Sequence, residues 1–225
     1  MTRTGGVVPF TVDCPYTLLM PPGVAAPPLV VALHGMGQTE DHMRRFMAPL
    51  LQRPWAWLFP RGPYPYEIRK PERTRIGHAW YLFTGDQQAL RESMDLGAAH
   101  LGRVLDAAGE FSRVALAGFS QGGYLAAYAG PMLAPRVAAA ACLGGRIKHE
   151  FLAGVSAQVK AGFALAQFHG GRDENVAPAL AREAVEKTRA LGFARVHYGQ
   201  DPECSHEISA ALAGQLGEWL EEVLR

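Results

Sequence analysis

The stretch Val114-Ala-Leu-Ala-Gly-Phe-Ser-Gln-Gly-Gly-Tyr124 decides how the rest of this sequence is interpreted. Val114 to Ala117 is an apolar run typical of a buried strand, and Tyr124 to Ala129 is typical of the start of a helix. Between them, Gly118-Phe-Ser-Gln-Gly122 has the G-x-S-x-G pattern of a nucleophile elbow, which requires this strand–turn–helix context. Ser120 would lie at a strained apex, where flanking glycines remove side-chain bulk. The alternative is a glycine-rich turn with an incidental serine.

Apolar runs alternate with amphipathic stretches along most of the 225 residues. Besides the elbow strand, we expect strands at Leu29–Leu33, Trp55–Phe59, Val137–Leu143, Phe163–Phe168 and Arg195–Tyr198. We expect helices at Glu40–Leu51, Gln87–Ala108, Pro178–Leu191 and Ser209–Leu224. Thr4–Met20 contains an opening antiparallel strand, with Phe10 in its alternating pattern, and Arg61–Gly85 is irregular. This order predicts one α/β domain over residues 1–225, with a mainly parallel central sheet and helices on both faces.

Composition excludes several classes of partner. The sequence is 48% hydrophobic with a formal net charge of +1, which gives no reason to expect a nucleic-acid partner. Residues 1–9 lack the apolar core of a signal peptide, and no apolar run reaches membrane-spanning length, so we expect a cytoplasmic protein without stable membrane insertion. The three cysteines are widely spaced and the histidines lack ligand spacing, so we expect neither a disulfide framework nor a metal site.

Three chemically suited side chains follow three different strands. Ligands bind outside the carboxyl ends of the strands in a sheet of this kind, and Ser120, Asp173 and His206 each follow a predicted strand. Their order along the chain is the order of an α/β-hydrolase triad. His206 would accept the Ser120 proton, and Asp173 would orient the imidazole. Taken singly, Asp173 is also explained as a carboxylate near a helix N-terminus, and His206 as a neighbour of an N-cap.

Two backbone amides are candidates for an oxyanion hole. The Gln121 amide follows the nucleophile at the start of a helix, where amides point outward. The loop His34-Gly-Met-Gly37 follows the strand Leu29–Leu33, and its glycines allow a tight turn that presents the Met36 amide.

These segments together resemble the phospholipase/carboxylesterase family, which includes acyl-protein thioesterases and compact bacterial carboxylesterases. The matching segments are Leu33-His-Gly-Met-Gly37, Gly118-Phe-Ser-Gln-Gly-Gly123, His169-Gly-x-x-Asp-x-x-Val176 and His206-Glu-Ile208. The resemblance implies an α/β-hydrolase fold and carboxylic-ester or thioester substrates, without metal or cofactor. It carries over Ser120, Asp173 and His206, and the Met36 and Gln121 amides.

The pocket is less well defined by the sequence. The Gly144–Gly162 connection is too short for a large cap domain, so the site should be open to small or medium-sized esters. Trp80, Tyr81 and Phe83 either line an acyl groove or belong to the core. Arg146 begins Arg-Ile-Lys-His149, where the family resemblance leads us to expect a more neutral pocket loop, and it is a further candidate for substrate binding.

The Arg61–Gly85 segment is unusually basic. Its cations are Arg61, Arg69, Lys70, Arg73 and Arg75, offset by two glutamates. A solvated loop is the favoured interpretation, and a rim that attracts anionic substrates is the sharper hypothesis.

The sequence therefore predicts a serine carboxylesterase that hydrolyses esters or thioesters through an acyl-Ser120 intermediate. Within that class, an acyl-protein thioesterase and a lysophospholipase remain alternatives. Outside it, the alternative is a ligand-binding protein without turnover. The sequence leaves a homodimer open.

Overall fold

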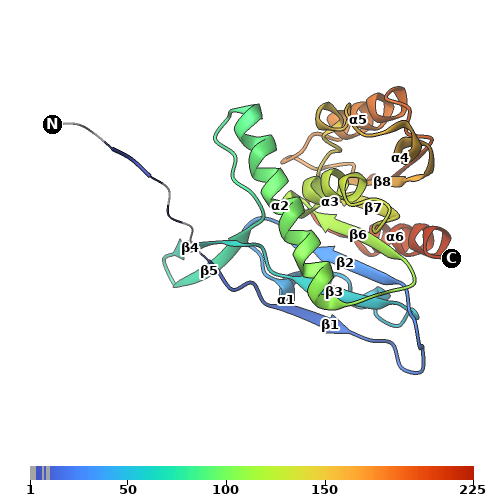
Figure 1. Cartoon of the computed structure of the whole chain (residues 1–225), viewed down its shortest axis with the longest axis horizontal. Helices are drawn as coiled ribbons and strands as arrows, with labels where there is room; N and C mark the ends of the chain where they lie inside the picture. The colour runs from blue at the N-terminus through green and yellow to red at the C-terminus, as the bar shows by residue number, and fades with distance from the viewer. Residues whose placement is uncertain (1–3, 7, 9–10) are drawn as a thin grey trace.

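A seven-stranded sheet in the order β1-β3-β2-β6-β7-β8-β9 forms the centre of the computed structural model, which describes residues 4–6, 8 and 11–225 (Figure 1). β2, β3 and β6 to β9 run parallel, and only β1 is antiparallel, against β3. The bounds are β1 Tyr16–Leu19, β2 Leu29–Leu33, β3 Ala56–Pro60, β6 Val114–Phe119, β7 Ala139–Leu143, β8 Ala164–Gly170 and β9 Arg195–Asp201. The predicted parallel sheet and opening antiparallel strand are confirmed, although Phe10 lies outside the described residues.

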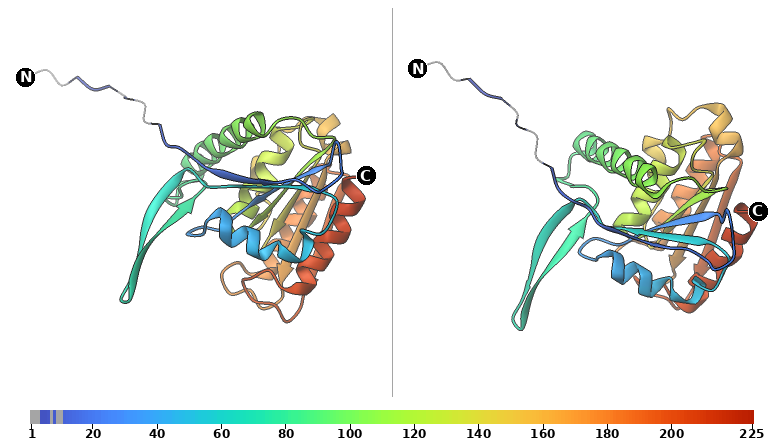
Figure 2. Two further views of the ribbon diagram at one scale, coloured as in Figure 1. Left: turned by 90° about the horizontal axis from the view of Figure 1, so that it is seen from below. Right: turned by 60° about the horizontal axis from the view of Figure 1, so that its bottom comes forward.

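Alternate residues of each central strand enter one of two hydrophobic cores. Leu29, Val31 and Leu33 of β2 pack with α2 (Gln87–Ala108), α3 (Gln121–Met132) and α5 (Pro178–Ala190). Val30 and Ala32 point to the other face and pack with α1 (Glu40–Phe46) and α6 (Ala210–Val223). Figure 2 shows these two helical layers on opposite sides of the sheet. Because both faces are covered, β2 is apolar at every position.

The segment expected to be irregular, 61–85, contains a β-hairpin instead. β4 (Tyr64–Lys70) and β5 (Arg73–Ala79) pair antiparallel in a separate two-stranded sheet that extends away from the body of the molecule (Figure 2). Most side chains on β4 are exposed, and Pro65 interrupts the pattern, so the hairpin lacks the apolar alternation that identifies a strand. The prediction of irregular structure was wrong for this reason.

The remaining connections are short. The predicted helix at Glu40–Leu51 ends early at Phe46 and continues as the 3-10 turn η1 (Ala48–Leu50). Between β7 and β8 the chain forms only η2 (His149–Phe151) and α4 (Ala157–Gly162), so no further domain is inserted there.

In the described part of the chain, no helix combines the length and apolar composition needed to cross a bilayer.

Candidate active site

Ser120 lies at the turn that joins β6 to α3, near the middle of the sheet (Figure 1). Its φ of 51° and ψ of −119° are strained for an L-residue, and among the described residues it alone combines a positive φ with a side chain. The glycines make the turn possible. A Cβ at Gly118 would overlap the Gly122 carbonyl, and a Cβ at Gly122 would lie 2.5 Å from the His34 carbonyl oxygen.

His206 connects Ser120 to Asp173 by two hydrogen bonds. His206 Nε2 lies 3.0 Å from Ser120 Oγ, and His206 Nδ1 lies 2.8 Å from Asp173 Oδ2. An ionised carboxylate only accepts hydrogen bonds, so Nδ1 carries the proton and Nε2 is free to accept one from the serine hydroxyl. The three side chains predicted from the sequence are therefore within direct hydrogen-bonding distance.

The Asp173 carboxylate is buried and its two oxygens are used differently. Oδ1 accepts the amides of Asn175 and Val176, both at 2.9 Å, while Oδ2 accepts from His206. His169, also buried, donates from Nε2 to the Val176 carbonyl at 2.8 Å, and this nitrogen lies 3.5 Å from Asp173 Oδ2. The hydrogen bonds to Oδ1 and Oδ2 fix the orientation of the Asp173 carboxylate.

The loop after β2 and the start of α3 place the Met36 and Gln121 residues beside Ser120, and both line the same pocket as Ser120 and His206. The amides that flank Met36 are already engaged. Gly35 donates to Gln38 Oε1 at 3.0 Å, and Gly37 donates to the His78 carbonyl at 2.9 Å. The Met36 amide thus lies between two fixed neighbours, which suits it to hold a developing negative charge.

Trp80 and the Gln121 side chain join these two amide-bearing segments. Gln121 Oε1 accepts the Trp80 amide at 2.9 Å, and Gln121 Nε2 donates to the Tyr81 carbonyl at 3.0 Å. The Trp80 indole Nε1 donates to the His34 carbonyl at 2.7 Å. Sequence reasoning missed this connection, because no pattern in the sequence shows that residue 80 contacts both residue 34 and residue 121.

His34 anchors the same loop from the inside. Its Nε2 accepts the Gly62 amide at 3.0 Å, so Nδ1 carries the proton and donates to the Gly35 carbonyl at 2.8 Å. Burial lowers the pKa of His34 to about 4, and the hydrogen bond to Gly35 only partly opposes this effect. The imidazole is therefore neutral at physiological pH.

The β4–β5 hairpin contacts the loop that follows β2, at Gly37 and Gln38, rather than the pocket. His78 exchanges backbone hydrogen bonds with Gly37 and Gln38, and Arg75 donates to the Gly37 carbonyl at 2.5 Å. Two of the other arginines predicted to form the basic rim are also engaged, Arg61 with Glu40 and Arg69 with Glu67. Of the described residues, those that line the pocket include none of the five predicted basic side chains. These side chains therefore lie outside the pocket wall, and an effect of the basic segment on anionic substrates stays a prediction.

The pocket beside Ser120 has a volume of about 820 Å³. Tyr81, Phe83 and Arg146 line it, as expected for substrate-binding residues. Trp80 does not line the pocket as a substrate-binding residue; it is completely buried and belongs to the core, the other alternative given by the sequence. Leu90 and Met94 of α2 supply apolar surface to the pocket. The sequence predicted them only as part of the amphipathic helix at Gln87–Ala108. The lining residues are Met36, Tyr81, Phe83, Gln87, Leu90, Met94, Ser120, Gln121, Tyr124, Arg146, Lys148, Asn175, Val176 and His206.

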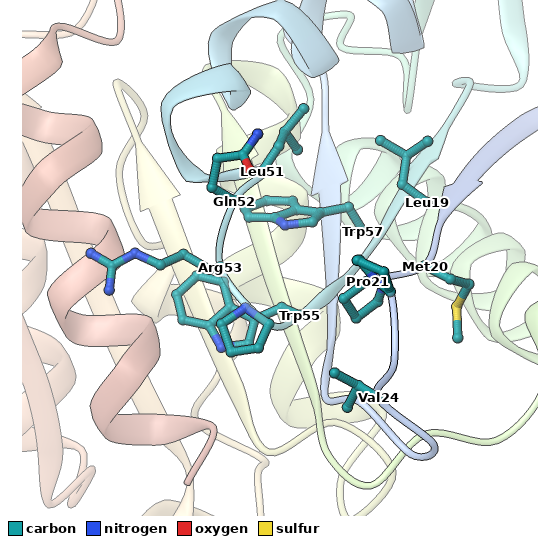
Figure 3. Close-up of a pocket in the computed structure, with 11 residues that line it drawn as sticks. Leu19, Met20, Pro21, Val24, Leu51, Gln52, Arg53, Trp55 and Trp57 are labelled. Atoms are coloured by element: carbon teal, nitrogen blue, oxygen red, sulfur yellow. The ribbon is translucent and has the colours of Figure 1, made fainter.

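A second cavity of about 250 Å³ lies at the opposite ends of the strands, between the β1–β2 turn and the start of β3 (Figure 3). Met20, Trp55 and Trp57 are among its lining residues, and it includes none of the predicted site residues. Within the described residues, no cluster of three or more His, Cys, Asp or Glu side chains is suited to hold a metal ion.

The sheet order, the elbow and the Ser–His–Asp geometry define an α/β hydrolase. The chain belongs to the Phospholipase/Carboxylesterase family, whose model matches residues 16–224. It is 24% identical to lysophospholipase-like protein 1 of Mus musculus, over 95% of this chain and 93% of that protein.

Two solved structures show the same fold. The chain matches acyl-protein thioesterase 2 of Zea mays with a TM-score of 0.76 and 21% identity, over 94% of this chain and 99% of that one. It matches the Bacillus cereus carboxylesterase with a TM-score of 0.72 and 17% identity, over 93% and 94% of the two chains.

Proposed function

We propose that this protein is a serine esterase that hydrolyses small to medium-sized carboxylic esters or thioesters through an acyl-Ser120 intermediate. The observation that carries the proposal is the His206 imidazole, which bridges the Ser120 hydroxyl and the buried Asp173 carboxylate. A hydroxyl is a weak nucleophile unless a base accepts its proton, and this arrangement supplies a correctly oriented base.

Acylation begins when Ser120 Oγ attacks the substrate carbonyl and its proton passes to His206 Nε2. The carbonyl oxygen becomes an oxyanion that accepts hydrogen bonds from the Met36 and Gln121 amides. The tetrahedral intermediate collapses as the bond to the leaving group breaks, and His206 gives its proton to the departing alcohol or thiol. Asp173 stabilises the imidazolium while it exists.

Deacylation repeats these steps with water as the nucleophile. His206 accepts a proton from water, hydroxide adds to the acyl carbonyl, and the same amides hold the oxyanion. The bond to Ser120 Oγ then breaks, His206 returns the proton to the serine, and the carboxylic acid leaves.

The volume and lining of the pocket favour substrates of intermediate size. Its volume of about 820 Å³ is at the upper end of ordinary ligand pockets, and Tyr81, Leu90 and Met94 give it an apolar lining. A medium-length acyl chain fits this description. Acyl-protein thioesterase and lysophospholipase activities are alternatives within the same chemistry, and palmitoylated peptide and lysophosphatidylcholine are the substrates that distinguish them.

The test is hydrolysis of p-nitrophenyl esters from acetate to palmitate by wild type and Ser120→Ala. We expect the substitution to lower kcat/KM by about 10³-fold or more, because the nucleophile is removed. Ser112→Ala is the matched control, since Ser112 is exposed and lies just before β6 begins, at the end of that strand away from Ser120. A fluorophosphonate probe should label wild type and Ser112→Ala, but not Ser120→Ala.

Two results would contradict the proposal. One is an unchanged rate in Ser120→Ala, which would exclude that residue as the nucleophile. The other is a folded wild type that hydrolyses no ester or thioester and takes no label, which would favour the ligand-binding alternative.

A further inference from the structure

One wall of the catalytic pocket is cationic. Arg146 and Lys148, from the loop after β7, both line the pocket that contains Ser120 and His206. Lys148 is only 6% exposed, although lysine is almost never buried without a partner. The rest of the pocket is largely apolar, so the position of these two charges restricts what binds there.

Glu150 neutralises only part of this charge. It accepts two hydrogen bonds from Arg146, at 2.6 and 3.1 Å, and lies 3.5 Å from Lys148 Nζ. Burial alone would raise the pKa of Glu150, but the hydrogen bonds from Arg146 and the backbone, with the nearby positive charges, lower it to about 2. One carboxylate therefore serves two cations.

Lys148 has no other anionic partner among the described residues. Its ammonium donates to the neutral Gln87 Oε1 at 2.9 Å and lies 4.9 Å from the Phe151 ring centroid. Burial lowers the pKa of Lys148, which reflects the cost of holding a charge there. A substrate anion would offset that cost.

The carboxylate that binds His206 is already engaged. Asp173 accepts two amides and the His206 ring, and none of the described residues that line the pocket is acidic. His149 contacts Glu150, and burial lowers its pKa, which favours the neutral imidazole, so His149 adds no negative charge to offset the cations. The pocket thus has a largely apolar lining and one cationic wall, whose ion-pair partner among the described residues is Glu150.

We propose that Arg146 and Lys148 select ester or thioester substrates that carry an anionic group, such as a carboxylate, separated from the scissile carbonyl by an apolar spacer. The apolar spacer would lie against Leu90, Met94 and Tyr124, and the anion would accept hydrogen bonds from the cations. This inference rests on the proposed esterase function and specifies its substrate class.

The experiment compares substrates that differ only in one charge. Mono-p-nitrophenyl adipate and p-nitrophenyl hexanoate have the same acyl length, and only the first ends in a carboxylate. 4-Carboxyphenyl hexanoate and phenyl hexanoate place the charge on the leaving group instead. After correction for the uncatalysed rate, the ratio of kcat/KM for the anionic and neutral member of each pair measures anion selection.

We expect wild type to prefer the anionic member in at least one pair, and added salt to reduce this preference. Lys148→Met and Arg146→Met should each lower that ratio by about tenfold, the effect of one charge-assisted hydrogen bond. The pair that responds identifies whether the acyl group or the leaving group carries the anion. Lys70→Met, which removes the same charge from the exposed hairpin, should leave the ratio unchanged.

The ratio separates selectivity from a general loss of folding or activity, and the two variants test it independently. Equal ratios in wild type, Lys148→Met and Arg146→Met would overturn the inference, and so would an equal fall in Lys70→Met. If neutral esters are hydrolysed through Ser120 without anion preference, only the inference fails. If wild type hydrolyses no ester, both it and the proposed function fail.

Discussion

The Ser120–His206–Asp173 array and the 61–85 segment both reach the proposed active-site pocket, but they do so by different means. The array consists of three side chains that contact each other directly, within 3.0 Å at each step. The 61–85 segment acts mostly through its backbone. The Gly62 amide binds His34, and the amide of Trp80 and the carbonyl of Tyr81 bind Gln121.

This difference separates chemistry from positioning. The proposed nucleophile and base need particular functional groups, so their loss should remove activity almost completely. The 61–85 segment contacts the loop that bears the Met36 amide and the start of α3, which bears the Gln121 amide, so changes there should weaken activity by altering distances. Substitutions in the Ser120–His206–Asp173 array should therefore lower activity more than substitutions that disturb the contacts of the 61–85 segment.

The largest loss of activity is expected from Asp173→Asn. Oδ1 faces the amides of Asn175 and Val176, so the asparagine oxygen would take that position and its NH₂ group would face His206. His206 Nδ1 would then accept, and Nε2 would carry the proton and could not accept another from Ser120. We expect kcat to fall by about 10³- to 10⁴-fold in steady-state ester hydrolysis.

Glu174→Gln is the matched control for that variant. It removes the same charge from the adjacent, exposed residue and should retain wild-type kcat. A similar loss in both variants would point to the local charge rather than to the tautomer of His206.

A smaller effect, on the stability of the fold, is expected when protonation of His34 at low pH weakens its contact with the 61–85 segment. Burial lowers the pKa of His34 to about 4, below its usual 6.5, so the unfolded chain takes up the proton first as the pH falls. The stability contributed by neutral His34 is present above pH 6.5 and is lost as the pH falls toward 4. The full loss is about 3 kcal/mol.

The measurement is urea unfolding of wild type and His34→Gln between pH 7 and pH 4. A glutamine oxygen can accept the Gly62 amide without titrating, so the variant should lose less stability over this range. Other histidines whose pKa is lowered, such as His197, act in the same direction in both proteins and cancel in the difference. Parallel stability curves would contradict this role for His34.

The sequence was sufficient for the parts of the fold that repeat a simple pattern. β2 is buried at all five positions, and α2 begins at Gln87 and ends at Ala108 as the apolar stripe predicted. The elbow was also predictable, because the strained turn at Ser120 requires glycines at fixed spacing. In these places local sequence and global structure impose the same constraint.

The 61–85 segment could not be predicted in the same way. The β4–β5 hairpin is largely exposed, so burial leaves no period of two in its sequence. Trp80 is buried, as aromatic residues commonly are, but that tendency does not show which carbonyl its indole contacts. Such contacts depend on loops far apart in the chain, and only the assembled structure brings them together.

The smallest of these effects is expected from Gln121→Met. This substitution is also the most direct test of positioning. Methionine preserves the backbone amide and approximate length of Gln121, but it cannot accept the Trp80 amide or donate to the Tyr81 carbonyl. We expect kcat to fall by about tenfold with little change in KM, because the oxyanion forms only after substrate is bound. Hydrolysis kinetics and inhibition by a trifluoromethyl ketone, which forms a tetrahedral adduct with the serine, measure this effect.

Gln88→Met is the control, since Gln88 is exposed on α2 and its substitution removes the same functional group outside the site. If the Gln121 side chain only stabilises the fold, its substitution should lower the melting temperature without changing kcat. If it positions the amide, affinity for the ketone should fall in proportion to kcat while substrate binding stays nearly constant. This proportionality distinguishes an indirect contribution to the reaction from general support of the pocket, because only positioning acts selectively on the tetrahedral state.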